Sequence, residues 1–251
     1  MKVMSFNVLC GGREEKEWTF RTYRVAQTIR DIAPDTFGVQ EAHFGWMTYL
    51  TENLPEYAYV GVGRDDGREE GEFSAVFYKR DKYELLDSGT FWLSETPDKP
   101  GKGWDAVCVR ICSYAFLREK ETGREFVHFN THLDHVGQIA MQKGAELVAK
   151  KACELFPGKI AFFTGDFNVT PESAPCKAVK DGGFVDSRDV AEIADMSNTF
   201  HAYTTGDMGV NVIDYVFVKG GVKVEKFTVV KNVIDGMYPS DHWAVYSDIA
   251  F

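Results

Sequence analysis

Short apolar runs alternate with longer amphipathic segments along this chain. Trp18–Ala33 carries apolar side chains near helical spacing and stops at Pro34, which predicts an amphipathic helix. Further helices are expected at Phe44–Leu54 and Gly137–Leu155, and a short one is expected to open at Thr170-Pro171-Glu172, where an N-cap residue, a proline and an early acid follow one another.

The remaining apolar runs have the length and bounding turns of strands. Ile160–Asp166 (IAFFTGD) is nearly all apolar, which predicts a strand buried on both faces. The polar turn Arg118–Arg124 separates two runs that are expected to form a hairpin. The other predicted strands are Lys2–Leu9, Thr36–Glu41, Tyr57–Val62, Phe73–Tyr78, Tyr83–Thr90, Ala106–Leu117, Glu125–His132, Ile213–Val218, Lys223–Val230 and Trp243–Phe251.

Many strands with few helices predict two stacked sheets with helices outside. The pattern supports an α/β or α+β fold but does not determine its topology. No internal repeat, low-complexity tract or long linker divides the chain, so residues 1–251 are expected to form a single domain.

Composition and charge narrow the choice of partner. Apolar residues make up 44% of the chain, enough for a sizeable core, and the formal net charge is -10. Proteins that wrap duplex DNA are usually basic, so this charge argues against nonspecific duplex binding. It does not exclude a nuclease, because a local cleft and bound cations can supply positive charge.

Cysteine usage and the first residues bear on location. The chain has 5 cysteines, an odd number, and no CxxC pair, so reduced thiols are expected. Strand-like sequence begins at once, without a signal-peptide core or an apolar run long enough to span a membrane. The expectation is a cytoplasmic protein without membrane contact or obligate protein partner; a leader removed before residue 1 would make it secreted.

Acidic and amide side chains recur at the ends of the apolar strands. Asn7 and Glu41 each end a predicted strand, where a turn residue or a solvated edge is the ordinary alternative. Asp166 and Asn168 in GDFN are two residues apart, which places both side chains on one side of a strand end. We favour a function for this pair over a simple turn.

Histidines cluster at the end of the strand EFVHFNTH. By parity His132 shares a face with His128 and Asn130, and it can hold a phosphate oxygen from the strand end. For His128 we favour a structural role in the core. His135 and Asp134 follow at once, and they either line the site or form the turn into the next helix.

Two further acids and a histidine occur near the C-terminus. Asp214 opens the apolar strand IDYVFV, where burial of its charge calls for a cation or an imidazole as partner. Asp241 and His242 are adjacent, so both reach one site only if the chain bends, and Pro239-Ser240 make such a bend plausible. Glu41, Asp241 and Asn7 offer the oxygen ligands that Mg²⁺ takes, whereas no zinc motif, GxSxG, Walker A or GxGxxG sequence occurs.

The ordered motifs MSFNV, VQE, VFYKR, NTHLDH, TGDFN, IDYVFV and SDHWAV closely resemble the endonuclease/exonuclease/phosphatase superfamily, from Asn7 to His242. The resemblance implies a four-layer α/β/β/α sandwich and a divalent-metal-dependent hydrolase of phosphate esters. It implies Mg²⁺ or Mn²⁺ on Glu41, with Asn7 and Asp241 nearby.

The same resemblance implies roles for the other strand-end residues. His242, oriented by Asp214, would contact the phosphate or act as base, and Asp166 would position or deprotonate the attacking water. Which of the two is the base stays open. Asn168 and His132 would stabilise the charge that builds on the phosphoryl oxygens.

The substrate is less determined. NTHLDH departs from the abasic-site endonucleases and favours the exonuclease, deadenylase and phosphatase branches. We expect a nuclease for single-stranded or short nucleic acid, with a phosphatase or phosphodiesterase of a small molecule or lipid head group as the alternative; a non-catalytic binding module is a third hypothesis. Candidate substrate contacts are Tyr78, Arg110, His135 and the rim aromatics Phe91, Trp92 and Trp104, for which burial against the sheet edge is an equally good interpretation.

Overall fold

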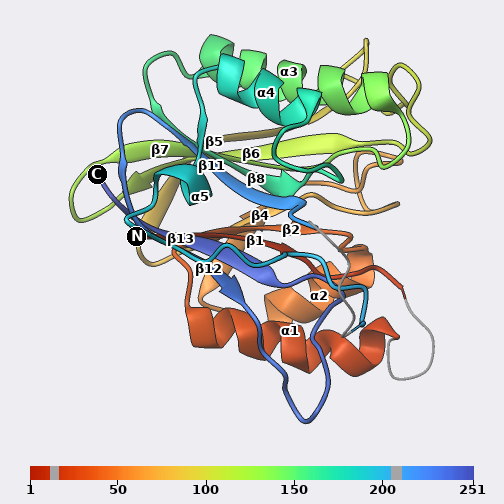
Figure 1. The fold of residues 1–251 in the computed structure, drawn as a ribbon, viewed down its shortest axis with the longest axis vertical. Helices are drawn as coiled ribbons and strands as arrows, with labels where there is room; N and C mark the ends of the chain where they lie inside the picture. The colour runs from red at the N-terminus through yellow and green to blue at the C-terminus, as the bar shows by residue number, and fades with distance from the viewer. Residues whose placement is uncertain (12–16, 205–210) are drawn as a thin grey trace.

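Two β-sheets lie face to face, and each is covered on its outer side by a pair of helices (Figure 1). This is the four-layer arrangement expected from the sequence. The computed structural model describes residues 1–11, 17–204 and 211–251. Among these residues no helix is both long and apolar enough to span a membrane.

The first sheet has seven strands among the described residues, in the order β10-β12-β13-β1-β2-β4-β3. Its outer face packs on helices α1 and α2 (Figure 1). The elements are β1 (Lys2–Asn7), α1 (Trp18–Ile32), β2 (Thr36–Gln40), α2 (Phe44–Asn53), β3 (Tyr57–Val60), β4 (Val76–Lys79), β10 (Ile193–Ala194), β12 (Lys223–Val230) and β13 (Ala244–Ala250).

The second sheet has six strands in the described part of the chain, in the order β5-β6-β7-β8-β11-β9. Helices α3 and α4 cover its outer face (Figure 1). The elements are β5 (Tyr83–Trp92), β6 (Ile111–Glu119), β7 (Glu125–His132), α3 (Gln138–Leu155), β8 (Ile160–Asp166), α4 (Ala174–Asp181), β9 (Val185–Asp186), α5 (Ser187–Val190) and β11 (Asp214–Lys219).

Three apolar clusters hold the layers together. One lies under α1 and α2, one under α3 and α4, and the third fills the space between the sheets. The strand IAFFTGD (β8) is a nearly unbroken apolar run because both of its faces are packed. Phe163 packs toward α3 and α4, whereas Phe162 packs between the sheets. Burial on both faces, predicted for this strand, is therefore confirmed.

Several predicted boundaries are wrong, each for a local reason. The helix expected at Thr170 begins at Ala174, with Ser173 at its N-cap and Pro175 in its first turn, so the same signals apply a few residues later. The strand expected from Phe73 begins at Val76, because the Ala75 carbonyl accepts from Val39 and the Asn130 side chain.

The strand expected over Ala106–Leu117 also begins later, at Ile111. The N–H groups of Val107 and Cys108 donate to the Asp134 carboxylate, so this segment forms a loop. The short elements β9, α5 and β10 were not predicted, since segments of two to four residues show no periodicity.

Chain direction brings one end of both sheets together. β1 and β2 are parallel in the first sheet, as are β7 and β8 in the second. β13 runs antiparallel to β1 and β11 antiparallel to β8, so their first residues lie at the same end as the last residues of β1 and β8. The strand-end polar residues therefore gather at one edge of the sandwich.

His128 is a core histidine, as the sequence favoured. It lies between the sheets with no exposed surface, and its ring nitrogens are 2.8 Å from the hydroxyl oxygens of Thr36 and Thr164. Burial lowers the pKa of His128 to about 3.

A depressed folded-state pKa makes His128 a source of acid sensitivity. The unfolded chain binds this proton near pH 6.5, so stability is full above that pH and falls as the pH drops toward 3. We expect a loss of about 3 kcal/mol from this group by pH 4. Denaturant unfolding of wild type and His128→Gln between pH 7 and 4 measures it; equal slopes in the two proteins would contradict the assignment.

Candidate active site

The end of the sandwich where the strand ends meet carries the site. Asn7 ends β1 and Glu41 follows β2, both from the seven-stranded sheet. His132 ends β7 and Asp166 ends β8 in the other sheet, and Asp214 lies opposite Asp166 in the strand register. Asp241 and His242 precede β13. The structure thus brings together the catalytic and metal-binding residues predicted from sequence.

Asn7 joins the two carboxylates that come from different sheets. Its Nδ2 donates to Glu41 Oε1 at 3.0 Å and to Asp166 Oδ2 at 2.9 Å, while its Oδ1 accepts from Leu9 N at 2.9 Å. The amide oxygen keeps a second lone pair, so the role of Asn7 as a metal ligand stays a prediction. Through its Nδ2, Asn7 also orients the two carboxylates.

Glu41 is held in a rare backbone conformation, with φ at 59°. That geometry directs its carboxylate over the end of β1, where Oε2 accepts from Cys10 N at 3.0 Å. Burial alone would raise the pKa of Glu41, but the hydrogen bonds from Cys10 and Asn7 outweigh it and lower the pKa. The group is therefore ionised at neutral pH.

The donor set fits a hard divalent cation. Ligand atoms of Glu41, Asp166 and His132 all lie within 4.8 Å of one another. Burial raises the pKa of Asp241, and the nearby charge of Glu41 raises it further. A cation between such carboxylates relieves their repulsion, and oxygen donors of this kind suit Mg²⁺ or Mn²⁺.

His242 is paired with Asp214 in the interior. Its Nδ1 is 2.9 Å from Asp214 Oδ2, and its Nε2 faces Asp166 Oδ2 at 3.7 Å. Burial alone lowers the pKa of His242, but Asp214 and Asp166 outweigh it and raise the pKa to about 10. The imidazole is therefore cationic at neutral pH, when it donates rather than accepts a proton.

Asp166 has the opposite balance. Burial raises its pKa to about 7, helped by the charge of Asp214 and opposed by His242 and by hydrogen bonds from Asn168 N and Asn7. A carboxylate poised near neutral pH can accept a proton from water. These pKa shifts make Asp166 a candidate base and His242 a candidate cationic donor.

Asn168 orients His132. With φ at 54°, Asn168 places its Nδ2 3.0 Å from His132 Nε2 and 3.1 Å from the Leu133 carbonyl oxygen. The second contact identifies this atom as a donor, so His132 Nε2 accepts and Nδ1 carries the proton. Burial, followed by the charge of Arg110, lowers the pKa of His132 well below its usual value, so the ring is neutral.

Both N–H groups of the Asn168 side chain are engaged within the protein, so a bond to a phosphoryl oxygen would replace one of these contacts. The contact of Asn168 with the substrate therefore stays a prediction, whereas its contact with His132 is present in the structure.

A pocket of about 370 Å³ opens beside these groups. The strand-end residues that line it include Glu41, Asp166, Asn168 and His242. Residues of other segments complete the lining: Arg64, Glu72, Cys108, Arg110, His135 and Phe200.

The endonuclease/exonuclease/phosphatase family model matches residues 4–242. The chain belongs to this family. Over nearly the whole length it is 37% identical to a family member from Bacteroides vulgatus, with a TM-score of 0.95 and 99% and 98% of the two chains covered. A mannosyl-6-phosphatase from Bacteroides thetaiotaomicron is 36% identical, with a TM-score of 0.94 and both chains fully covered at 100%.

Curated relatives share a smaller part of their length. The 3'-5'-exoribonuclease subunit Ccr4 of the CCR4-Not complex from Emericella nidulans is 28% identical over 164 residues, which are 53% of this chain and 24% of that protein. The family and the fold agree with what the sequence motifs implied.

Two of the predicted substrate contacts lie elsewhere. Tyr78 pairs with Thr36 at the far end of β2 and packs in the cluster between the sheets, so it does not face the pocket. Trp104 lies in the loop before β6, where its backbone N–H donates to the Glu95 carboxylate. It does not line the pocket. Arg110 and His135 do line it.

The proposed aromatic rim is mostly core. Phe91 and Trp92 are 6% and 7% exposed, and the Trp92 indole N–H donates to the Arg64 carbonyl at 2.7 Å. Burial against the sheet edge, the alternative interpretation, is therefore the right one for both. Their surface is not available for stacking on a base.

Arg64 and Glu72 were not predicted as site residues; they lie in and beside the acidic segment DDGREEGE at positions 65–72. In the structure Arg64 Nη1 and Glu72 Oε2 form an ion pair at 2.7 Å, and Arg110 Nη1 lies 4.0 Å from the same oxygen. The signal in the sequence was weak, because only the folded loop brings Glu72 beside Arg110.

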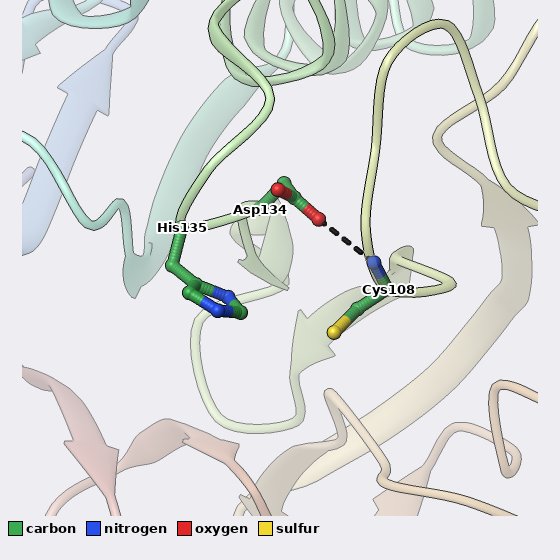
Figure 2. Close-up of side chains that lie close together, drawn as sticks. All are labelled: Cys108, Asp134 and His135. Carbon is green, nitrogen blue, oxygen red and sulfur yellow. Dashed lines mark hydrogen bonds between the residues drawn. The ribbon is translucent and has the colours of Figure 1, made fainter.

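The side chains of Cys108, Asp134 and His135 lie close together (Figure 2). Asp134 accepts from four backbone N–H groups, including those of Cys108 and Gly137, which uses the lone pairs that a cation would need. His135 Nδ1 is 3.4 Å from Arg110 Nη2. Asp134 therefore fastens the loop before β6 to the turn after β7, the turn-forming role that the sequence left open.

Proposed function

We propose that this chain is a Mg²⁺- or Mn²⁺-dependent phosphatase that releases phosphate from a small phosphorylated molecule of about the size of a hexose phosphate. The observation that carries this proposal is the composition of the pocket, which is lined by the carboxylates of Glu41, Asp166 and Asp241 and by two arginines, Arg64 and Arg110, that share the carboxylate of Glu72. A volume of about 370 Å³ is near the lower end of the range for small-ligand sites, about 300–1,000 Å³.

Buried N–H donors without a hydrogen-bond partner, most of them on arginines, support a substrate rich in oxygen acceptors. Arg110 Nε and Nη1, Arg64 Nε and His132 Nδ1 are buried without a hydrogen-bond partner among the described residues. Such donors are costly when nothing accepts from them. Phosphate and sugar oxygens are suitable acceptors.

In the proposed reaction each strand-end residue has a separate task. Glu41 and Asp241 would hold the cation, which neutralises phosphate charge and stabilises the leaving oxygen. Asp166 takes a proton from the attacking water as the water oxygen bonds to phosphorus. The bond between phosphorus and the ester oxygen breaks, and the leaving alkoxide takes a proton from solvent. His242, kept cationic by Asp214, donates from Nε2 to a phosphoryl oxygen, and Arg110 contributes a second positive charge.

Two arguments favour this substrate class over nucleic acid. The stacking surface expected at the rim is absent, since Phe91 and Trp92 are buried. A neighbour that is 36% identical over its full length is a mannosyl-6-phosphatase, whereas the exoribonuclease relative is 28% identical over about a quarter of its length. Hydrolysis of short RNA is the second candidate, supported by that exoribonuclease relative.

Substrate screening tests the choice. Release of inorganic phosphate from hexose 6-phosphates and nucleoside monophosphates is compared with shortening of end-labelled single-stranded RNA and DNA, with Mg²⁺, with Mn²⁺ and with EDTA. We expect metal-dependent phosphate release from a sugar phosphate and intact oligonucleotides. Shortened oligonucleotides without turnover of any monoester would overturn the proposal in favour of a nuclease.

Arg110→Met tests whether the buried arginine donors bind the substrate. A hydrogen bond to a charged group contributes about 1.5–3 kcal/mol, so we expect kcat/KM for a monoester to fall about 10–100-fold. Steady-state kinetics with the matched variant Arg118→Met, an exposed arginine paired with Glu84 and Glu125, provides the control. Equal rates in Arg110→Met and wild type would remove Arg110 from substrate binding.

A further inference from the structure

A buried polar layer lies directly beneath the catalytic residues and joins the two sheets. On three strands its members precede a site residue by two positions and so share its face: Ser5 precedes Asn7, Asn130 precedes His132 and Thr164 precedes Asp166. The fourth member, Gln40, immediately precedes Glu41. All four side chains have no exposed surface.

Asn130 is the centre of this layer and crosses between the sheets. From β7 its Nδ2 donates to the carbonyl oxygens of Val39 at 2.8 Å and Ala75 at 3.0 Å, both in the opposite sheet or its connecting loop. Its Oδ1 accepts from Gln40 Nε2 at 2.7 Å and from Thr164 Oγ1 at 3.0 Å. Both donors and both lone pairs of the amide are thus used.

The opposite strand leaves space for this amide. Gly38 faces Asn130, and a Cβ at position 38 would lie 2.2 Å from Asn130 Oδ1 and 2.5 Å from Thr164 Oγ1. Any side chain at Gly38 would push the sheets apart at this level. The backbone of β2 and the side chain of Asn130 are therefore matched to one inter-sheet spacing.

That spacing matters because the site is divided between the sheets. The metal-binding candidates Glu41 and Asp241 belong to the seven-stranded sheet, whereas Asp166 and His132 belong to the other. A cation and the base that acts beside it therefore keep their distance only if the sheets do. Small displacements of reacting groups lower rates strongly without abolishing binding.

We infer that Asn130 is a positioning residue, which sets the distance between the metal ligands of one sheet and the base of the other through its cross-sheet hydrogen bonds. The inference rests on the phosphoester chemistry of the site and not on the identity of the substrate. It predicts that loss of the polar layer lowers turnover but leaves metal affinity nearly unchanged.

Asn130→Ala and Gly38→Ala test this in complementary ways, since the first removes the hydrogen bonds and the second displaces them while keeping every polar group. With Mn²⁺ and p-nitrophenyl phosphate or its bis-ester, we expect kcat to fall at least about tenfold, with KM and the Mn²⁺ dissociation constant within about twofold of wild type. His128→Gln is the matched control, because His128 lies on the same strand and face one layer deeper and also bridges the sheets.

A measurement independent of turnover completes the test. Co²⁺ bound at the carboxylates should shift the NMR signals of the labelled His132 ring differently in Asn130→Ala and wild type, because the metal and the ring lie on different sheets. Unchanged shifts and kcat in Asn130→Ala, or an equal fall of kcat in a His128→Gln protein of matched stability, would overturn the inference. A wild-type protein inactive on these esters would count against the proposed function, while the Co²⁺ shifts would still decide the role of Asn130.

Discussion

Asp166→Asn is expected to lower kcat by about 10²–10⁴-fold, the range for loss of a general base. The replacement keeps the shape of the side chain but cannot accept the proton of the attacking water. Asp166 must be deprotonated to act, so the wild-type rate should rise with pH through a limb at or below about 7, because a bound cation lowers the pKa further. The variant should lack this limb.

Rates measured from pH 5 to 9 with saturating Mn²⁺ check both statements. Mn²⁺ binding, followed by calorimetry, should be retained in Asp166→Asn, since Glu41 and Asp241 remain. Near-wild-type turnover in the variant would refute Asp166 as the base, and a persistent limb would assign the ionisation to another group.

His242→Ala is expected to reduce kcat by about 10²–10³-fold, as found when one donor to a developing oxyanion is removed. The substitution also leaves Asp214 buried without its partner, at a cost of about 3–5 kcal/mol of stability. Activity and unfolding must therefore be measured together, at a temperature where the variant is folded.

The double variant Asp214→Asn with His242→Ala separates the two effects. It removes the unpaired charge, so stability should recover while the rate stays low. If the double variant regains turnover along with stability, His242 has a structural role only. Asp214→Asn alone should retain the fold and lose part of the rate, because the imidazole is then less strongly held in its cationic form.

Much of the fold could be predicted because it depends on local patterns. Burial on both faces made β8 an unbroken apolar run, and the amphipathic spacing of α1 and α3 predicted both helices within a residue at either end. The error at Thr170 came from capping signals that recur a few residues later, and the error at Ala106 came from a loop whose backbone is paired by the distant side chain of Asp134. Periodicity carries no information about such partners.

The site residues were predictable for a similar reason. Polar side chains that end apolar strands must leave the core, and strands of one sandwich end together. Contacts were less predictable, since they depend on distance: Asn7 donates to both Glu41 and Asp166, and Asn168 contacts His132 and the Leu133 carbonyl.

The sequence by itself therefore determined most helices and strands through apolar periodicity. Its short motifs, through their resemblance to a known family, implied the four layers and the class of reaction. Only the tertiary structure decided the protonation of Asp166 and His242, the burial of Phe91 and Trp92, and the layer of Asn130 that joins the sheets. These properties arise between residues more than 25 positions apart in the chain, such as Asp214 and His242, whose separation is 28. Charge, burial and hydrogen bonding act through space, so they exist only once the sheets have come together.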